Sequence, residues 1–172
     1  MIIDILNELA STSSRLEKEA ILKREESNEL LKKVFFLAYD PFTQFYQRKI
    51  PAYEKNNTAH AASLESMLPS LNDLSSRSVT GNAAIDRLTS ILEVVCGTES
   101  EVIERIIKKD LKCGASESTA NKIWPGLIHE YPCMLCTPFD QKIVDKFSFP
   151  AYAQLKMDGM RFNAIVKDGK CE

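Results

Sequence analysis

Apolar residues at helical spacing run through the first 130 positions of this 172-residue chain. Ile2, Ile5 and Leu9 share one side of a helix, and the segment 29–39 has a wider apolar face. A face of this kind is stable only when other helices cover it. The pattern therefore predicts a mainly α fold, with an all-helical domain over residues 1–130.

Residues that cap helices divide this region into separate elements. Ser14 opens a capping-box pattern, and Asn28 can cap the apolar segment 29–39. Pro69 lies inside an apolar pattern over residues 63–77. A proline in a helix interior removes a hydrogen bond and clashes with the preceding turn, so we expect a kink or a split into two shorter helices there.

Two more helices are expected in the last third of this region. Thr98 with Glu101 forms a second capping box, which predicts a helix that runs on toward Gly114 as its stop. Ser116 can cap a short helix that ends near Trp124. We assign Trp124 to packing, because a large aromatic side chain at such a position is usually part of the core.

The composition suits a soluble globular chain, with 44% hydrophobic and 27% charged residues. The net charge of −2 gives no sign of nucleic-acid binding, so such a site would have to be a local basic surface. No apolar stretch is long enough to span a bilayer, and no secretory signal is present. The five cysteines are scattered, and the Cys133–Cys136 pair lacks the further ligands of a zinc site. We expect free thiols, no metal-ligating residues of this kind and a reducing compartment.

The pattern changes at the end of the helical region. Four prolines between positions 125 and 150 predict an extended linker. Beyond it, the segments 149–155 and 161–166 have the composition of two strands, and Asp158-Gly159 is a favoured hairpin turn between them. Residues 131–172 are therefore expected to hold a linker and the first strands of a second domain.

The turn between these two segments carries a distinctive set of side chains. Lys156, Asp158, Gly159 and Arg161 occupy set positions in the hexapeptide KMDGMR, which joins one apolar segment to the next. A charged β-turn is the simplest interpretation of an Asp-Gly pair. The whole pattern, however, resembles the KxDGxR motif of ATP-dependent DNA ligases and of their relatives, the RNA ligases and mRNA capping enzymes.

This resemblance implies a nucleotidyl-transfer site. Lys156 would be the nucleophile that takes AMP from ATP, with Mg²⁺ or another divalent cation offsetting the charge of the phosphates. The other residues assigned to nucleotide or DNA-end contacts are Gln154, Leu155, Asp158, Gly159 and Arg161. Gln154 stands where many ligases have glutamate.

Three segments of the helical region are similar to the DNA-binding domain that precedes the catalytic domain in ATP-dependent DNA ligases. They are 78–84 (SVTGNAA), 109–116 (KDLKCGAS) and 120–126 (ANKIWPG). Together with KMDGMR they most resemble the T-even-phage type, and the resemblance covers essentially the whole chain. It implies a DNA-binding domain over 1–130, the start of an α+β adenylation domain over 131–172, and a full-length enzyme that seals DNA nicks in replication, repair and recombination.

Two helix starts are candidate phosphate-binding positions, because free N–H groups and the helix dipole favour anions there. Gly81 and Gly114 each precede an expected helix, and lysines lie near the second of them. The residues assigned to DNA binding are Gly81, Asn82, Lys108, Lys112, Gly114, Ala115, Ser116 and Lys122, with Lys109 adding charge beside them. Ordinary helix caps on a solvated basic face would show the same spacing. With the resemblance, the expected partner is nicked double-stranded DNA, bound without sequence readout.

Two alternatives remain open. An RNA ligase or capping-type nucleotidyltransferase shares the Lys156 chemistry, although it does not account for the helical region. A non-catalytic DNA-binding fragment is the second, because the other catalytic parts of the family follow the KxDGxR motif. We therefore expect this chain to bind nicked duplex without sealing it. We also expect a monomer in the cytoplasm (of the host, for a phage protein) and no membrane contact; the sequence identifies no sliding-clamp partner.

Overall fold

The computed structural model describes most of the helical region and parts of the remainder. The described residues are 1–58, 60–130, 138–148, 150–152, 164, 166–167 and 169–171. They belong to two compact units, Met1–Tyr131 and Pro132–Glu172, and each unit is considered by itself. The assignment of the first to DNA binding and of the second to an adenylation domain stays a prediction.

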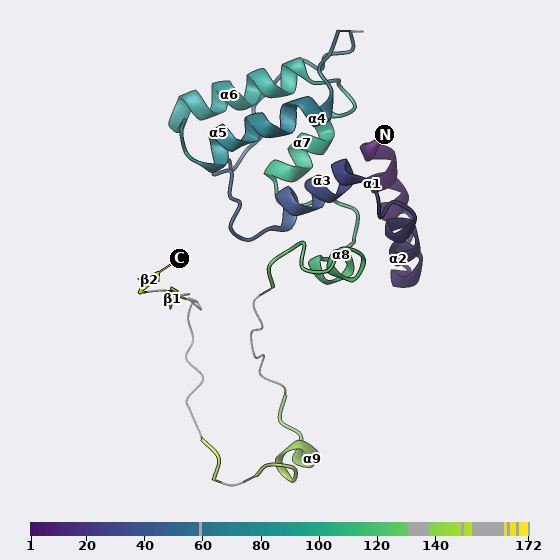
Figure 1. The fold of residues 1–172 in the computed structure, drawn as a ribbon, viewed down its shortest axis with the longest axis vertical. Coiled ribbons are helices and arrows are strands. Elements are labelled where there is room, and N and C mark those ends of the chain that lie inside the picture. Colours follow the sequence, from purple (N-terminus) through teal and green to yellow (C-terminus); the bar gives the residue numbers. More distant parts are fainter. Residues whose placement is uncertain are drawn as a thin grey trace. The chain divides into compact units, whose positions relative to one another are not determined.

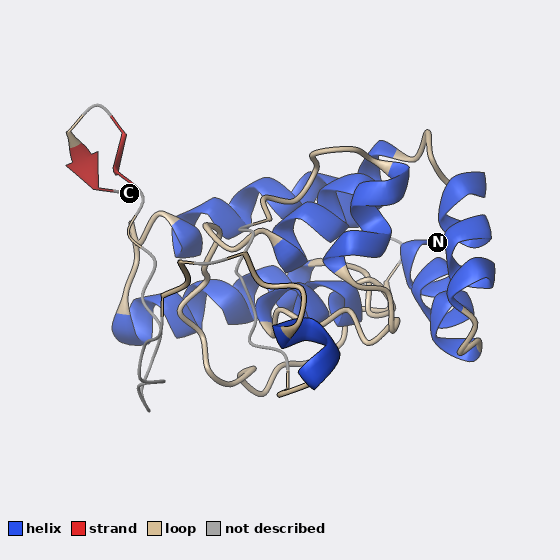
Figure 2. Ribbon diagram, turned by 90° about the horizontal axis from the view of Figure 1, so that it is seen from below, coloured by secondary structure: helices blue, strands red, loops and turns tan. Residues whose placement is uncertain are grey.

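The first unit is built from short helices that pack around one another (Figures 1 and 2). In chain order they are α1 (Ile2–Ser11), α2 (Arg15–Arg24), α3 (Glu29–Tyr39), α4 (Leu64–Met67), the 3₁₀ turn η1 (Leu68–Leu71), α5 (Asn72–Ser75), α6 (Gly81–Val94), α7 (Ser100–Ile107) and α8 (Glu117–Ile123). Helix α1 contacts α2 and α7, α3 packs on α7, and α2 packs on α8. The prediction of a mainly α fold is confirmed.

Three of the expected caps form as the sequence predicts. The Ser14 hydroxyl accepts a hydrogen bond from the Glu17 amide at the start of α2, at 3.4 Å. The Asn28 side chain accepts one from the Leu31 amide at the start of α3, and the Ser116 hydroxyl accepts one from the α8 backbone. Each cap satisfies an amide that has no partner within its own helix.

Replacing Asn28 with alanine should lower the free energy of unfolding by about 1 kcal/mol, because the Leu31 amide then loses its acceptor. Urea denaturation of the wild type and of Asn28→Ala measures the difference. Asn57→Ala is a suitable control, because Asn57 is exposed and lies outside every helix. Equal losses of stability in the two variants would contradict the capping role.

The expected helix around Pro69 is divided, as predicted. Residues 64–67 are α-helical, 68–71 form the 3₁₀ turn η1 with proline near its start, and 72–75 return to an α-helix. Leu64, Leu68, Leu71 and Leu74 are nonetheless all buried, so the apolar stripe survives the change in helix type.

The capping box expected at Thr98 is wrong. Helix α7 begins at Ser100, and its N-cap residue is Glu99, which makes no side-chain cap to it. The Glu99 carboxylate instead accepts a hydrogen bond from the Leu64 amide at 2.8 Å, at the start of α4. This carboxylate therefore caps a helix other than α7. Backbone hydrogen bonds to the Cys96 carbonyl form the turn that precedes α7.

The expected helix stop at Gly114 is also wrong, because α7 ends earlier, at Ile107. Lys109 adopts a left-handed backbone conformation with φ of 56°. Its ammonium donates hydrogen bonds to three carbonyl oxygens, of Leu37 (3.0 Å), Asp40 (2.8 Å) and Thr43 (2.8 Å). These acceptors lie at and beyond the C-terminal end of α3, so Lys109 stabilises that end. Burial lowers the pKa of Lys109.

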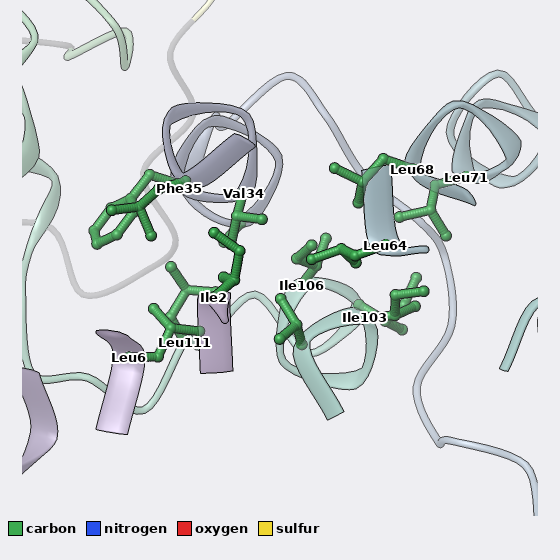
Figure 3. Close-up of a cluster of buried hydrophobic side chains, with 14 of the residues drawn as sticks. Ile2, Leu6, Val34, Phe35, Leu64, Leu68, Leu71, Ile103, Ile106 and Leu111 are labelled. Carbon is green, nitrogen blue, oxygen red and sulfur yellow. The ribbon is translucent and has the colours of Figure 1, made fainter. Parts of the chain in front are cut away.

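Buried apolar side chains from most of the helices meet in one core (Figure 3). The residues labelled there are Ile2, Leu6, Val34, Phe35, Leu64, Leu68, Leu71, Ile103, Ile106 and Leu111. The Phe35 ring is fully buried and lies 5.6 Å, centroid to centroid, from the ring of Trp124. Trp124 is buried and donates its indole N–H to the Glu26 carbonyl at 2.9 Å, so its assignment to packing is confirmed.

The second unit contains one helical turn and one short hairpin within its described residues. Helix α9 (Gln141–Val144) lies where an extended linker was expected, and Asp140 caps it through the Lys142 amide at 2.9 Å. Strand β1 (Val166–Lys167) pairs antiparallel with β2 (Lys170–Cys171), a hairpin that the sequence did not predict (Figure 2). The hairpin expected around Asp158-Gly159 lies mostly outside the described residues.

Candidate nucleic-acid interface

A polar hollow of about 210 Å³ lies beside Gly114. Its walls come from the turn between α1 and α2, from α2 itself, and from the loop that leads into α8. We call it the Gly114 hollow, and it is lined by Ser13, Arg15, Lys18, Gly114, Ser116, Ser118 and Thr119. Its lining thus combines two cationic side chains with four hydroxyl groups and no carboxylate.

Lys18 is the most unusual residue of the Gly114 hollow. Its side chain belongs to α2 but only 7% of the residue's surface is exposed. The ammonium donates hydrogen bonds to the carbonyl oxygens of Leu9 at 2.5 Å and Cys113 at 2.6 Å. It therefore connects the end of α1 to the loop that carries Gly114.

Gly114 is required by two features of this arrangement. Its φ is +63°, a left-handed conformation that glycine adopts without penalty. A Cβ atom at this position would also lie 2.8 Å from the Lys18 Nζ. The adjacent Ala115 is buried and contributes to the core, while Ser116 caps α8 and faces the hollow.

The lysines expected around Gly114 differ in their surroundings. Lys122 pairs with Glu19 at 2.6 Å, and Arg15 contacts the same carboxylate at 3.0 Å. The hydrogen bond from Lys122, followed by that from Arg15, lowers the pKa of Glu19.

Lys108 pairs with Glu104 at 3.5 Å, and Lys112 is exposed with φ of 52°. Lys109 differs from the expectation, because all three of its N–H groups are used by the carbonyls beyond α3.

A second, larger hollow of about 630 Å³ lies at the start of α6, where Gly81 is the first helical residue with φ of +57°. We call it the Gly81 hollow. It is lined by Tyr46, Gln47, Arg48, Lys49, Ile50, Pro51, Gly81, Asn82 and Ile85. Arg48 and Lys49 are exposed and form no ion pair among the residues that the structure describes.

Tyr46 and Arg77 border this region in strained conformations. Their φ values are 57° and 58°, and the Arg77 guanidinium lies 4.9 Å from the centroid of the Tyr46 ring. Within the described part of the chain, the non-glycine residues with positive φ are these two together with Lys109 and Lys112. Such conformations cost free energy and concentrate at functional sites, and here they flank Gly81 or precede Gly114.

The structure thus brings each predicted glycine together with basic residues that sequence reasoning missed. Arg15 and Lys18 join Gly114, while Arg48, Lys49 and Arg77 lie near Gly81. The pair Arg48-Lys49 is a visible basic signal in an expected loop, but nothing local connects Lys18 with a residue 95 positions away. The residues of the KxDGxR motif and its neighbours, Gln154, Leu155, Lys156, Asp158, Gly159 and Arg161, lie outside the described residues and stay predictions.

Within the described residues, no helix combines the length and apolar character that crossing a membrane demands. Among them, Cys96 and Cys113 carry free thiols, whereas Cys133 and Cys136 lie outside them.

Comparison with known proteins finds strong similarity to phage enzymes. The chain is 44% identical over 170 residues to the DNA ligase of Enterobacteria phage T4, and equally to the DNA ligase of Enterobacteria phage T6. These matches cover 97% of this chain and 35% of each ligase, so the chain spans about a third of the relatives' length. No protein-family model matches the chain.

Solved structures support the same relationship. The chain matches the structure named Pmar-Lig_PreS3 with a TM-score of 0.67 and 28% identity, over 74% of this chain and 31% of that one. The structure named Pmar-Lig_Pre gives a TM-score of 0.65 at 28% identity, over 72% and 29% of the two chains. The resemblance drawn from the motifs is confirmed: over 97% of its length, this chain is homologous to the N-terminal part of the DNA ligases of phages T4 and T6 and is related to the ATP-dependent DNA ligases.

Proposed function

We propose that this chain is the N-terminal part of an ATP-dependent DNA ligase, and that its helical unit holds nicked duplex DNA for the catalytic unit. The observation that carries the proposal is the 44% identity to two phage DNA ligases over 97% of the chain. The Gly114 and Gly81 hollows add physical support. Each joins a glycine in a left-handed conformation to basic side chains, and no carboxylate is among the residues that line them.

The proposed mode of binding is contact with the DNA backbone. The chain has a net charge of −2, so non-specific attraction by the whole protein does not account for binding. Local cations at the two hollows can replace counterions on the phosphates, and free backbone N–H groups at the start of α6 can donate hydrogen bonds to phosphate oxygens. Contacts of this kind position a duplex without reading its sequence, as a nick-sealing enzyme requires.

The proposed chemistry begins at Lys156. Its neutral amine attacks the α-phosphorus of ATP, a P–N bond forms, and pyrophosphate leaves. The 5′-phosphate at the nick then takes AMP from the lysine, and the 3′-hydroxyl attacks that phosphate, forming the phosphodiester and expelling AMP. A free lysine has a pKa of about 10.4, so the site has to favour the neutral amine. We propose Mg²⁺ as the cofactor that offsets the charge of the phosphates. This part of the proposal rests on the KxDGxR motif.

Two narrower alternatives have their own tests. An RNA ligase would share the lysyl-AMP chemistry, and the full-length protein would then seal RNA better than a nicked DNA duplex. For this 172-residue chain alone we propose DNA binding without nick sealing, because it spans about a third of the length of the related ligases. Nick closure by this chain alone would overturn that part of the proposal.

Replacing both Arg48 and Lys49 with glutamine should weaken binding of a nicked duplex about tenfold or more at 0.15 M salt. Each lost phosphate contact should also reduce the salt slope, d log Kobs/d log [salt], by about 0.9 in magnitude. Fluorescence anisotropy at several salt concentrations measures both quantities.

The matched control for this experiment replaces Lys23 and Lys32 with glutamine. Both lysines are helical and pair with nearby glutamates, Lys23 at 2.7 Å and Lys32 at 3.6 Å, and neither lines the two hollows. This control removes the same charge and should leave the salt slope close to that of the wild type. Equal effects of the two double variants would show that overall charge, and not the Gly81 hollow, governs binding.

A further inference from the structure

We propose that the Lys18 ammonium binds one backbone phosphate of the duplex directly, with that phosphate seated in the Gly114 hollow. This inference rests on the proposed function and adds to it a specific ligand group and a residue that the sequence motifs do not include. The chemical class of the ligand is a phosphodiester anion, held by a buried ammonium and surrounding hydroxyl groups.

The charge of Lys18 is the first argument. The Lys18 residue is more than nine-tenths buried, and its ammonium has no carboxylate partner within ion-pair distance among the described residues. Two of its three N–H groups bond to the carbonyls of Leu9 and Cys113. A buried charge without a counter-ion is costly, and carbonyl dipoles offset only part of that cost. Lys18 lines the Gly114 hollow, where an anion would complete its coordination.

The other groups around the hollow suit a phosphate. Ser13, Ser118 and Thr119 contribute hydroxyls that can donate hydrogen bonds, and Arg15, whose Nε pairs with Glu19, contributes the remaining N–H groups of its guanidinium. The Ser116 and Ser118 hydroxyls form a hydrogen bond with each other at 2.9 Å, so one of the two keeps its hydrogen for donation to an anion. No acidic residue lines the hollow to repel it.

Access to the ammonium depends on Gly114. The Lys18 Nζ lies next to this residue, and a side-chain Cβ there would come within 2.8 Å of it. The absence of a side chain at Gly114 therefore leaves room for the ammonium and lets a DNA backbone approach the loop closely. This gives the glycine of the KDLKCGAS segment a function in phosphate binding beyond its turn conformation.

Lys109 provides a matched comparison within the same unit. Its ammonium also bonds to backbone carbonyls, but it has three of them, and no N–H remains for a ligand. Replacing Lys18 or Lys109 with methionine thus removes similar internal hydrogen bonds, while only the Lys18 substitution removes a cation from the lining of the hollow. Both variants are expected to lose stability, which thermal unfolding will report.

The test measures binding of the 172-residue chain to a nicked duplex at several salt concentrations. Lys18→Met should weaken binding about tenfold and reduce the magnitude of the salt slope by about 0.9, which corresponds to one phosphate contact. Lys109→Met should leave the salt slope unchanged at a temperature where both variants are folded. An unchanged slope for folded Lys18→Met would overturn the inference.

A second readout separates binding from a structural role. In a series of duplexes, one backbone phosphate at a time is replaced by an uncharged methylphosphonate. One position in the series should weaken wild-type binding and have no further effect on Lys18→Met, because the two changes remove the same contact. If Lys18→Met does not fold, the variant Arg15→Gln/Ser118→Ala takes its place and should lose sensitivity at that same position. Additive effects at every position would overturn the proposal.

Three further outcomes distinguish the sources of failure. Competition by inorganic phosphate at low millimolar concentration, without a methylphosphonate-sensitive position in DNA, would show that the hollow takes free phosphate and not the duplex. A wild-type chain that shows no salt-dependent duplex binding would overturn the proposed function itself. Wild-type binding that is intact while Lys18→Met behaves like wild type would overturn the Lys18 inference alone.

Discussion

Replacing Lys156 with alanine or arginine in a full-length ligase that carries this chain should abolish formation of the enzyme–AMP intermediate. Alanine removes the nucleophilic amine, and arginine keeps a positive charge but remains protonated at any accessible pH. We expect both substitutions to reduce transfer of labelled AMP from ATP by at least roughly a thousandfold, because a covalent step cannot proceed without its nucleophile. Gel detection of radiolabelled protein, followed by nick sealing, measures the two stages.

The control for this prediction is Lys167→Ala. Lys167 lies in strand β1, outside the KxDGxR motif, and its substitution should leave labelling near the wild-type level. Nicked DNA that already carries AMP on its 5′-phosphate adds a further distinction, because sealing it does not require the lysyl-AMP step. Lys156→Ala should therefore retain sealing of that substrate. Full labelling of Lys156→Ala would assign the nucleophile to another residue.

Replacing Phe35 with alanine should lower the free energy of unfolding of the helical unit by about 3–5 kcal/mol. The Phe35 side chain is fully buried and packs against the rings of Tyr39 and Trp124, with centroids 5.8 and 5.6 Å away. Alanine would leave a cavity where α3 meets the segment after α8, and the loss is large against the usual stability of a domain. Thermal or urea unfolding, followed by circular dichroism, measures it.

Phe139→Ala is the matched control for Phe35→Ala. The same side chain is removed, but Phe139 is 82% exposed, so its loss should change stability by less than about 0.5 kcal/mol. Because a fully buried ring loses both transfer free energy and packing contacts, the two phenylalanines should differ several-fold. Similar effects would show that the helical core does not depend on Phe35.

Local signals were enough to predict much of the helical fold. Ser14, Asn28 and Ser116 each lie next to the amides that they cap, and Pro69 divides its own helix. The errors have tertiary causes. The Glu99 carboxylate caps α4 across 35 residues, so the Thr98 capping box does not form. No pattern within the segment around Glu99 reveals that distant amide.

The candidate interface divides in the same way. Gly81 and Gly114 could be identified from their spacing and from the family resemblance, because both lie at helix starts in recognisable segments: Gly81 is the first residue of α6, and Gly114 comes shortly before α8. The cations near them could not be assigned, because Lys18 and Arg77 reach these positions only through folding. From the sequence, Lys109 is expected to be a charge on the protein surface. In the structure its ammonium instead bonds to the carbonyls at and beyond the C-terminal end of α3.

The indole of Trp124 is joined to Glu26 across 98 residues, and Lys122 is joined to Glu19 across 103. Helix α2 leaves the ribosome about a hundred residues before α8, the helix that packs on it. Closing so long a loop has an entropic cost that non-local contacts repay only when they form, which slows folding. The helical unit is therefore completed only after its last helix is synthesised, and until then α2 exposes the surface that α8 will cover.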